Sequence, residues 1–164
     1  MRLRVLPLLL ACLIVGACAD GRQLPVAPQA ESTSTLVALD VGGVPARVRV
    51  VDTHAARARG LSGVARLAPD EGMLFVYPYD ARRQFWMKDC LIGLDIAFLD
   101  ANGRVVQVET MAPPRGQGGA IPQTTRSPPS AYVLEMPAGW FARHKLGVGT
   151  RVRIPPSVQR ARAE

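Results

Sequence analysis

Apolar residues recur at every second position in several short segments of the chain, and this strand-like period limits its possible folds more than any other feature. Residues 94–110, LDIAFLDANGRVVQVET, hold two such segments on either side of the turn sequence Ala101-Asn102-Gly103. LVALDV, ARVRVVD, QFWMK, AYVLEM and TRVRI are further segments with the pattern of strands, and GMLFVY is a fully apolar strand segment. Only residues 53–60 and 138–146 have the pattern of short helices. The sequence therefore predicts a mainly β domain, a small β-sandwich or barrel-like fold with one or two short helices.

The N-terminal residues 1–17, MRLRVLPLLLACLIVGA, have the plan of a secretory signal peptide, with arginines ahead of a short apolar run. The run is too short to span a bilayer as a helix. The residues from Val15 to Cys18, VGAC, resemble the lipobox of bacterial lipoproteins, in which the cysteine thiol receives a diacylglyceryl group and the chain is cut before it. The resemblance implies that Cys18 is the lipidation site. Ordinary cleavage, which would leave Cys18 as a free thiol, is the alternative.

This N-terminal pattern predicts an extracytoplasmic protein that is lipid-anchored to a membrane facing the periplasm. Ala19 follows the cysteine, and by resemblance to the enterobacterial sorting rule it favours the outer membrane. Residues 18–35 are rich in Pro, Ala, Ser and Thr and are predicted to form a lipidated flexible tether. Residues 36–154 are then one β-rich domain, and residues 155–164 are expected to be a disordered tail.

Few residues in the predicted domain offer metal or redox chemistry. Cys90 is its one cysteine, so an internal disulfide is excluded, and the chain has only two histidines, His54 and His144. No metal site and no cofactor are therefore predicted. Cys90 lacks a neighbouring histidine and is expected to be a buried small apolar residue rather than a nucleophile.

The chain has a formal net charge of +7, and its arginines are scattered along the sequence. A basic balance is common to nucleic-acid-binding proteins, but the signal peptide directs the chain away from nucleic acid. The expected partners are membrane lipid through the N-terminal anchor and an unknown small molecule, envelope polymer or protein.

The turn at Ala101-Asn102-Gly103 is predicted to be a three-residue loop with Gly103 in the left-handed conformation. Asp95 then lies directly opposite Glu109 on the paired strand. A two-residue Asn-Gly turn is the alternative, and it places Ile96 opposite Glu109. The first register is preferred because the second sets apolar residues against polar ones along the hairpin.

Two carboxylates in direct opposition repel each other unless a cation or a shared proton relieves them. Lys88 or Arg82 could supply the cation. Three interpretations follow. Asp95 and Glu109 could be the acid and base of a saccharide hydrolase, they could help to hold a hard cation such as calcium, or they could belong to a salt-bridged structural network.

Trp86 and Lys88 alternate with apolar residues in QFWMK and therefore share one face of the predicted strand. With Arg82 and Asp95 they are the candidate ligand-binding residues, since an indole beside charged groups suits a sugar or a planar ligand. The alternative is a second layer of core under residues 112–130. That segment has no pattern of its own, and a mobile surface loop and a binding lid are equally open interpretations.

Four blocks of the sequence resemble the signature of domain-of-unknown-function family 192: ARARGLSG, DEGMLFVY, FWMKDCLIGLDIAFLDANGRV and YVLEMPAGWFARHKLGVGTRV. The resemblance covers nearly all of residues 36–154 and implies a compact, sandwich-like β fold and frequent export, without an established reaction. Many relatives read FWMKNT where this chain has Asp89-Cys90, and many carry loop cysteines that are missing here. A mechanism based on loop cysteines is therefore excluded, and a hydroxyl donor at position 90 is put in doubt.

Together these features predict a membrane-tethered extracytoplasmic domain that is a binding or envelope-associated module. A small hydrolase that acts on a saccharide or envelope polymer through paired carboxylates is the alternative.

Overall fold

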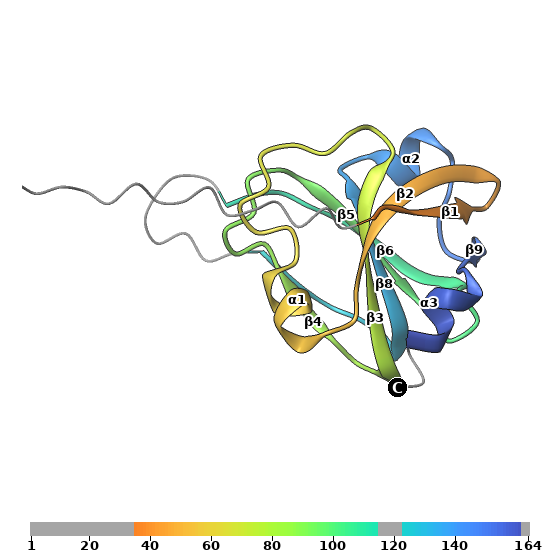
Figure 1. Cartoon of the computed structure of the whole chain (residues 1–164). Coiled ribbons are helices and arrows are strands. Elements are labelled where there is room, and N and C mark those ends of the chain that lie inside the picture. Colours follow the sequence, from red (N-terminus) through yellow and green to blue (C-terminus); the bar gives the residue numbers. More distant parts are fainter. Residues whose placement is uncertain (1–34, 115–122, 162–164) are drawn as a thin grey trace, which may run out of the picture. The chain divides into compact units, whose positions relative to one another are not determined.

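The computed structural model describes residues 35–114 and 123–161, which belong to one compact unit (Figure 1). The described helices are α1 (His54–Arg59), α2 (Trp140–Arg143) and α3 (Pro156–Ala161). The described strands are β1 (Val37–Val41), β2 (Val44–Val51), β3 (Glu71–Ala81), β4 (Gln84–Trp86), β5 (Leu94–Leu99), β6 (Val105–Met111), β7 (Thr124–Arg126), β8 (Ser130–Pro137) and β9 (Val152–Arg153). The prediction of a mainly β domain with short helices is confirmed. Within the described ranges, no helix is long and apolar enough to cross a membrane.

In the described part of the chain, seven strands form one sheet in the order β6-β5-β8-β3-β2-β1-β9. Strands β2 and β3 are parallel, with α1 in the connection between them, and the other neighbours in this sheet are antiparallel. Strands β4 and β7 pair only with each other. The main sheet is strongly curled in Figure 1.

Residues 149–153 join the two edges of this curled sheet. On one side, Val105 donates its backbone N–H to Thr150 at 2.9 Å, and Val152 donates to Gly103 at 2.8 Å. On the other side, β9 pairs with β1. The sheet is thereby closed at one end into a barrel-like shape, in which the start of β6 is paired rather than left as an open edge.

Both faces of the sheet are buried. Along β5, Leu94, Ile96 and Phe98 belong to an outer core cluster, whereas Ala97 and Leu99 belong to an inner one. The inner cluster lies inside the curl and includes the fully buried ring of Trp140 from α2. The outer cluster is covered by the segment around α1 and by β4.

The hairpin of β5 and β6 combines the expected turn with an unexpected register. Gly103 has the predicted left-handed conformation (φ 75°), and the N–H of Asp100 donates to the carbonyl of Arg104 at 3.0 Å. A bulge at Val106, however, shifts the pairing by one residue beyond Leu99. The preferred register is therefore wrong over most of the hairpin.

Several helices and strands begin or end at other residues than the sequence predicted. Residues 78–80, predicted as a turn, lie within β3, whose pairing with β8 is interrupted there. QFWMK yields only the short β4, which pairs with β7 from the segment 112–130 rather than with the main sheet. The helix predicted over 138–146 is reduced to α2.

The C-terminal tail is a further correction. Residues 155–164 were predicted to be disordered, yet α3 forms within them and places Val158 in the inner core. The predicted signal peptide, Cys18 and most of the tether lie outside the described residues, as does the middle of the loop 112–130.

Gly103 is predicted to be essential to the closure of the sheet. A Cβ atom at this position would lie 2.6 Å from the Val152 carbonyl oxygen, and its left-handed backbone disfavours other residues. Gly103→Ala should lower the free energy of unfolding by about 2 kcal/mol or more. The matched control is Gly147→Ala, because a Cβ there meets nothing within 4 Å. Urea denaturation of both variants provides the measurement, and equal midpoints would rule out this role.

Candidate functional site

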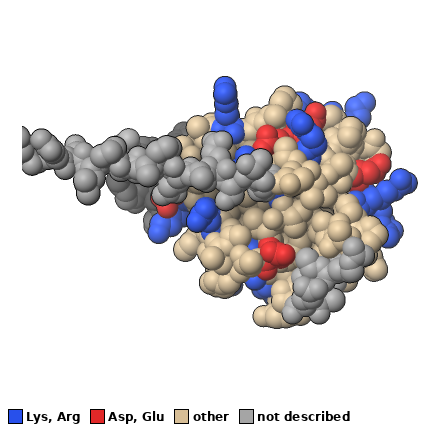
Figure 2. Space-filling model, viewed as in Figure 1, with Lys and Arg blue, Asp and Glu red and all other residues tan. Residues whose placement is uncertain are grey.

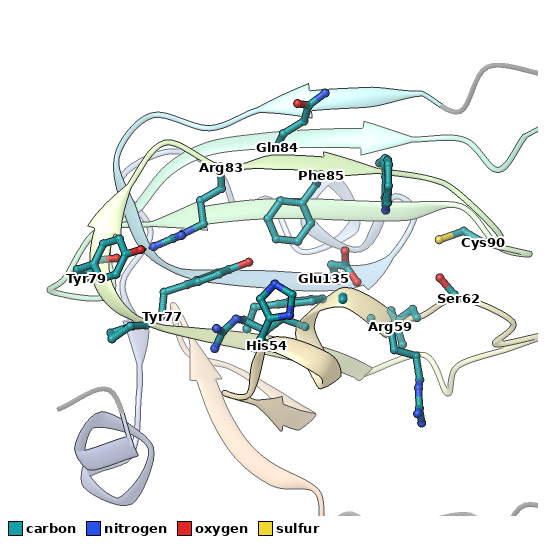
Figure 3. Close-up of a pocket in the computed structure, with 17 residues that line it drawn as sticks. His54, Arg59, Ser62, Tyr77, Tyr79, Arg83, Gln84, Phe85, Cys90 and Glu135 are labelled. Atoms are coloured by element: carbon teal, nitrogen blue, oxygen red, sulfur yellow. The ribbon is translucent and has the colours of Figure 1, made fainter. Parts of the chain in front are cut away.

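A cavity of about 470 Å³ opens on the outer face of the sheet, between α1, the second half of β3 and β4 (Figure 3). Its walls are mainly aromatic and cationic. The lining includes His54, Arg57, Arg59, Leu61, Ser62, Phe75, Tyr77, Tyr79, Arg83, Phe85, Trp86, Cys90 and Glu135.

Strand alternation places the floor of this cavity. On β3, Phe75 and Tyr77 point to the outer face, and on β8, Val133 and Glu135 do the same. Phe85 from β4 packs edge-on against Phe75, with their ring centroids 5.2 Å apart. The floor is thus a layer of aromatic rings with one carboxyl group.

Glu135 is that carboxyl group, and its surroundings are apolar. Its neighbours across the sheet are Met73 on β3 and Ile96 on β5, both buried. Only 6% of Glu135 is exposed, and its Oε2 atom has no hydrogen-bond partner among the described residues. Burial raises the pKa of Glu135 to about 8, because the ionised carboxylate would lose its contact with water. At neutral pH the group is therefore mostly protonated.

Cys90 lies beside this acid at one end of the cavity. Burial, followed by the charges of Glu135 and Asp89, raises the pKa of its thiol to about 11. Cys90 is therefore a thiol and not a thiolate at neutral pH, which removes its nucleophilic reactivity. Its burial in the core agrees with the interpretation as a small apolar residue.

Stacked cations and aromatic rings form the other end of the cavity. The Arg83 guanidinium lies 3.5 Å from the centroid of Tyr77 and 5.4 Å from that of Tyr79, and Arg57 lies 4.7 Å from the centroid of Tyr77. Arg57 is fixed by its Nη1 atom, which donates to the carbonyl oxygens of Val76 and Asp52. Burial raises the pKa of Tyr77 although both arginines lower it. Burial likewise lowers the pKa of Arg83.

Asp95, a candidate from the sequence, is on the opposite face of the sheet from this cavity. It is 1% exposed and accepts hydrogen bonds from Thr110 Oγ1 at 2.6 Å, from the N–H of Gly139 at 2.9 Å and from the N–H of Phe141 at 3.0 Å. The last two are unpaired donors at the start of α2, so Asp95 caps this helix from a distant strand.

Glu109 does not meet Asp95. The bulge sets Glu109 opposite Ile96 and sets Asp95 opposite Thr110, so the two carboxylates point to opposite faces of the sheet. Glu109 instead accepts a hydrogen bond from Gln107. The predicted opposition of the two acids is therefore wrong, and they cannot act together on one substrate.

The other residues predicted to bind a ligand are Trp86, Lys88 and Arg82, and only Trp86 lines the cavity. Trp86 lines the cavity and is 58% exposed at its mouth. Lys88 Nζ lies 5.8 Å from the Trp86 ring centroid, so the two do share a surface as the alternation predicted, although Lys88 does not line the cavity. Arg82 is exposed and also lies outside the lining.

Three residues of the cavity, Glu135, Arg83 and Arg57, were not predicted from the sequence. A signal existed for Glu135, because it is the one charged residue in AYVLEM, an otherwise apolar segment that had to be buried. No comparable signal marked Arg83, which lies next to the equally basic Arg82. Within residues 35–114 and 123–161, no cluster of three potential metal ligands occurs.

The DUF192 family model, described as "Uncharacterized ACR", matches residues 37–154. No curated protein sequence matches the chain. One similar crystal structure is that of a proposed transcription regulator from Sinorhizobium meliloti 1021, with 26% identity and a TM-score of 0.64 over 73% of this chain and 95% of the other. Another is a protein of unknown function from Novosphingobium aromaticivorans DSM 12444, with 27% identity and a TM-score of 0.64 over 73% and 85%.

The pKa of Glu135 makes a prediction about stability. The folded pKa of about 8 exceeds the ordinary value of 4.5, so the folded state holds the proton more tightly and loses stability as pH rises between these values. Glu135→Gln removes this loss. It should therefore be more stable than the natural protein by on the order of 4 kcal/mol at about pH 9 and nearly equal to it at about pH 4.

Urea denaturation across this pH range measures the effect. Glu109→Gln is the matched control, because Glu109 is only half-buried and already accepts a hydrogen bond. A constant difference between Glu135→Gln and the natural protein at all pH values would contradict the raised pKa.

Proposed function

We propose, for a chain that belongs to the DUF192 family, that the domain is a membrane-tethered extracytoplasmic binding module whose ligand enters the Glu135 cavity. The observation that carries the proposal is the Glu135 carboxyl group, which is buried in the cavity floor without a hydrogen-bond partner for Oε2 among the described residues. An arrangement of this kind lowers stability, and a ligand that bonds to the carboxyl group would compensate for it.

The mouth of the cavity supports a binding role. Tyr79 is 65% exposed, and Trp86 is exposed to a similar degree. Large aromatic side chains are costly to leave in water, and they provide rigid contact area with little loss of side-chain entropy on binding. A small molecule or one end of an envelope polymer would cover both rings as it enters.

The hydrolase alternative is not pursued, because it depended on Asp95 and Glu109 acting as a pair. These residues lie on opposite faces of the sheet, and Asp95 is occupied as a helix cap. Glu135 alone cannot supply both the acid and the base of glycoside cleavage.

The proposed membrane tether rests on the sequence of residues 1–35. The signal-like segment and the lipobox-like VGAC support lipidation at Cys18, and Ala19 supports transfer to the outer membrane. More than one acyl chain on Cys18 would give a stable anchor, since a single chain binds a membrane only weakly.

A nucleic-acid partner is not proposed, although one similar structure belongs to a proposed transcription regulator. Lys and Arg side chains on the face in Figure 2 are spread among Asp and Glu rather than gathered into one patch. Nucleic-acid binding usually needs a concentrated basic surface.

Ligand binding is predicted to depend on Glu135. A thermal-shift screen of amines, amino acids, saccharides and peptide fragments of envelope polymers should yield at least one compound that stabilises the natural protein. At about 100 times its Kd, such a compound raises the free energy of unfolding by about 2.7 kcal/mol. This stabilisation should disappear in Glu135→Gln and persist in Glu109→Gln. A compound that stabilises all three proteins equally would bind elsewhere and would count against the cavity.

Lipidation is predicted to depend on Cys18. Metabolic labelling with a fatty acid analogue should label the natural protein and should fail in Cys18→Ala. Cys90→Ala is the matched control and should retain the label, because Cys90 is buried in the folded domain. Label that persists in Cys18→Ala would exclude the proposed anchor.

A further inference from the structure

We propose that the ligand of the Glu135 cavity is an ω-amino acid: a primary ammonium group on an unbranched aliphatic stem, with a carboxylate at the other end. This inference rests on the proposed binding function and specifies the chemical class of the ligand. It follows from the unlike character of the cavity floor around Glu135 and of the end that holds Arg83 and Tyr79 (Figure 3).

The floor of the cavity suits an ammonium group on an apolar stem. Glu135 is the carboxyl group of the lining, and Leu61, Phe75 and Phe85 around it are apolar. Ser62 also lines the cavity, but its hydroxyl already donates to the carbonyl of Lys88 at 3.2 Å. A sugar ring would bring several hydroxyl groups to a floor with few partners for them, and each unpaired hydroxyl would cost affinity. An ammonium group has N–H donors only and can pair with the Glu135 carboxylate through charge-assisted hydrogen bonds. Its methylene stem gains from burial against the apolar and aromatic side chains.

The other end of the cavity suits a carboxylate. A guanidinium has five N–H donors. Arg83 Nη2 donates to the Tyr79 carbonyl at 2.5 Å. Arg83 Nε is buried without a partner among the described residues, so the donors that remain for a ligand are those of Nη1 and Nη2. Arg57 uses Nη1 for backbone carbonyls. Both arginines therefore keep donors for an anion, and their stacking on Tyr77 holds them at this end.

Glu135 and the two arginines line the same cavity, but no ion pair joins Glu135 to Arg57 or Arg83 among the described residues, so each remains available to a different group of one ligand. In the view of Figure 3, Arg83 and Tyr79 lie at one end, Cys90 and Ser62 lie at the other, and Glu135 lies between these groups. A zwitterion with its charges separated by a stem would match both ends, whereas a simple amine or a simple carboxylate would match one.

Binding of the ammonium group has a consequence for protons. Before a ligand binds, Glu135 carries a proton for most of the time at neutral pH, because burial raises its pKa. An ammonium group beside it favours the ionised carboxylate. The neutral acid therefore gives its proton to the buffer as the ligand binds, and a carboxylate–ammonium pair is formed.

The test is isothermal titration calorimetry on the purified full chain at about pH 7, in two buffers of different ionisation enthalpy. The probes are unbranched ω-amino acids of increasing length, beginning with glycine. The affinity for these ω-amino acids should peak at one chain length, and binding should release about one proton per ligand. The alkylamine and the alkylcarboxylate of that length should each bind at least about tenfold more weakly, which corresponds to about 1.4 kcal/mol.

Matched variants test which residue binds the ammonium group of the ligand and which binds its carboxylate. Glu135→Gln should abolish proton release and weaken the best ω-amino acid, with Glu109→Gln as its control. Arg83→Gln should remove the advantage of the ω-amino acid over the alkylamine, and the exposed neighbour Arg82 provides the control Arg82→Gln. If Glu135→Gln does not fold, the Arg83 pair and the one-ended probes on the natural protein still decide the result.

Other outcomes would overturn the inference and leave the binding function open to its own screen. These outcomes are an alkylamine that binds as tightly as the ω-amino acid, proton uptake on binding, or failure of every ω-amino acid to bind. A saccharide that stabilises the natural protein but not Glu135→Gln would support the binding function and refute this ligand class. Failure of both experiments would refute the function as well.

Discussion

The sheet of this domain is buried on both faces, and most other features depend on that constraint. Closure of the curled sheet by residues 149–153 creates an inner core. The packing of α1 and β4 against the other face creates an outer core. A central strand such as β8 then has no solvent-facing side on which to place a polar residue. Glu135 is buried because of its position in the sheet. Among the described residues, the cavity between α1, β3 and β4 is the space that its side chain borders.

Asp95 and Glu135 show how differently two buried acids can be treated on neighbouring strands. Asp95 faces the inner core and receives three hydrogen bonds, two of them from the first turn of α2. Glu135 faces the outer core, where its Oε2 atom has no hydrogen-bond partner among the described residues. Burial alone does not distinguish a structural carboxylate from a functional one; the supply of donors does. By this criterion Asp95 stabilises the fold, and Glu135 is the candidate for binding.

The sequence predicted the fold class because alternation and turn residues report local geometry directly. The hairpin at Gly103 has the predicted turn, yet its register was wrong beyond Leu99. The cause is the bulge at Val106, which adjoins a strand end that also pairs with residues 149–151. Such a contact comes from residues far along the chain and leaves no local pattern.

The site was less predictable than the fold for a similar reason. Trp86 was predicted as a ligand-binding residue because strand alternation sets its indole on the same face as Lys88, but the pairing of Asp95 with Glu109 depended on the wrong register. Arg83 is placed by its stacking on Tyr77, a residue of another strand. Arg82 and Arg83 are adjacent residues of the same type, and only Arg83 lines the cavity.

The two tryptophans of the chain differ in a way that makes each a separate optical reporter. Trp140 is sealed in the inner core and donates its indole N–H to Asp70 at 3.0 Å, so its emission remains constant until the curled sheet opens. Trp86 stands in water at the mouth of the cavity, where a change of local polarity alters its emission without any change of fold. Replacing either ring by phenylalanine would give a protein with a single fluorophore, in which occupancy of the cavity and loss of the folded state are read on different signals.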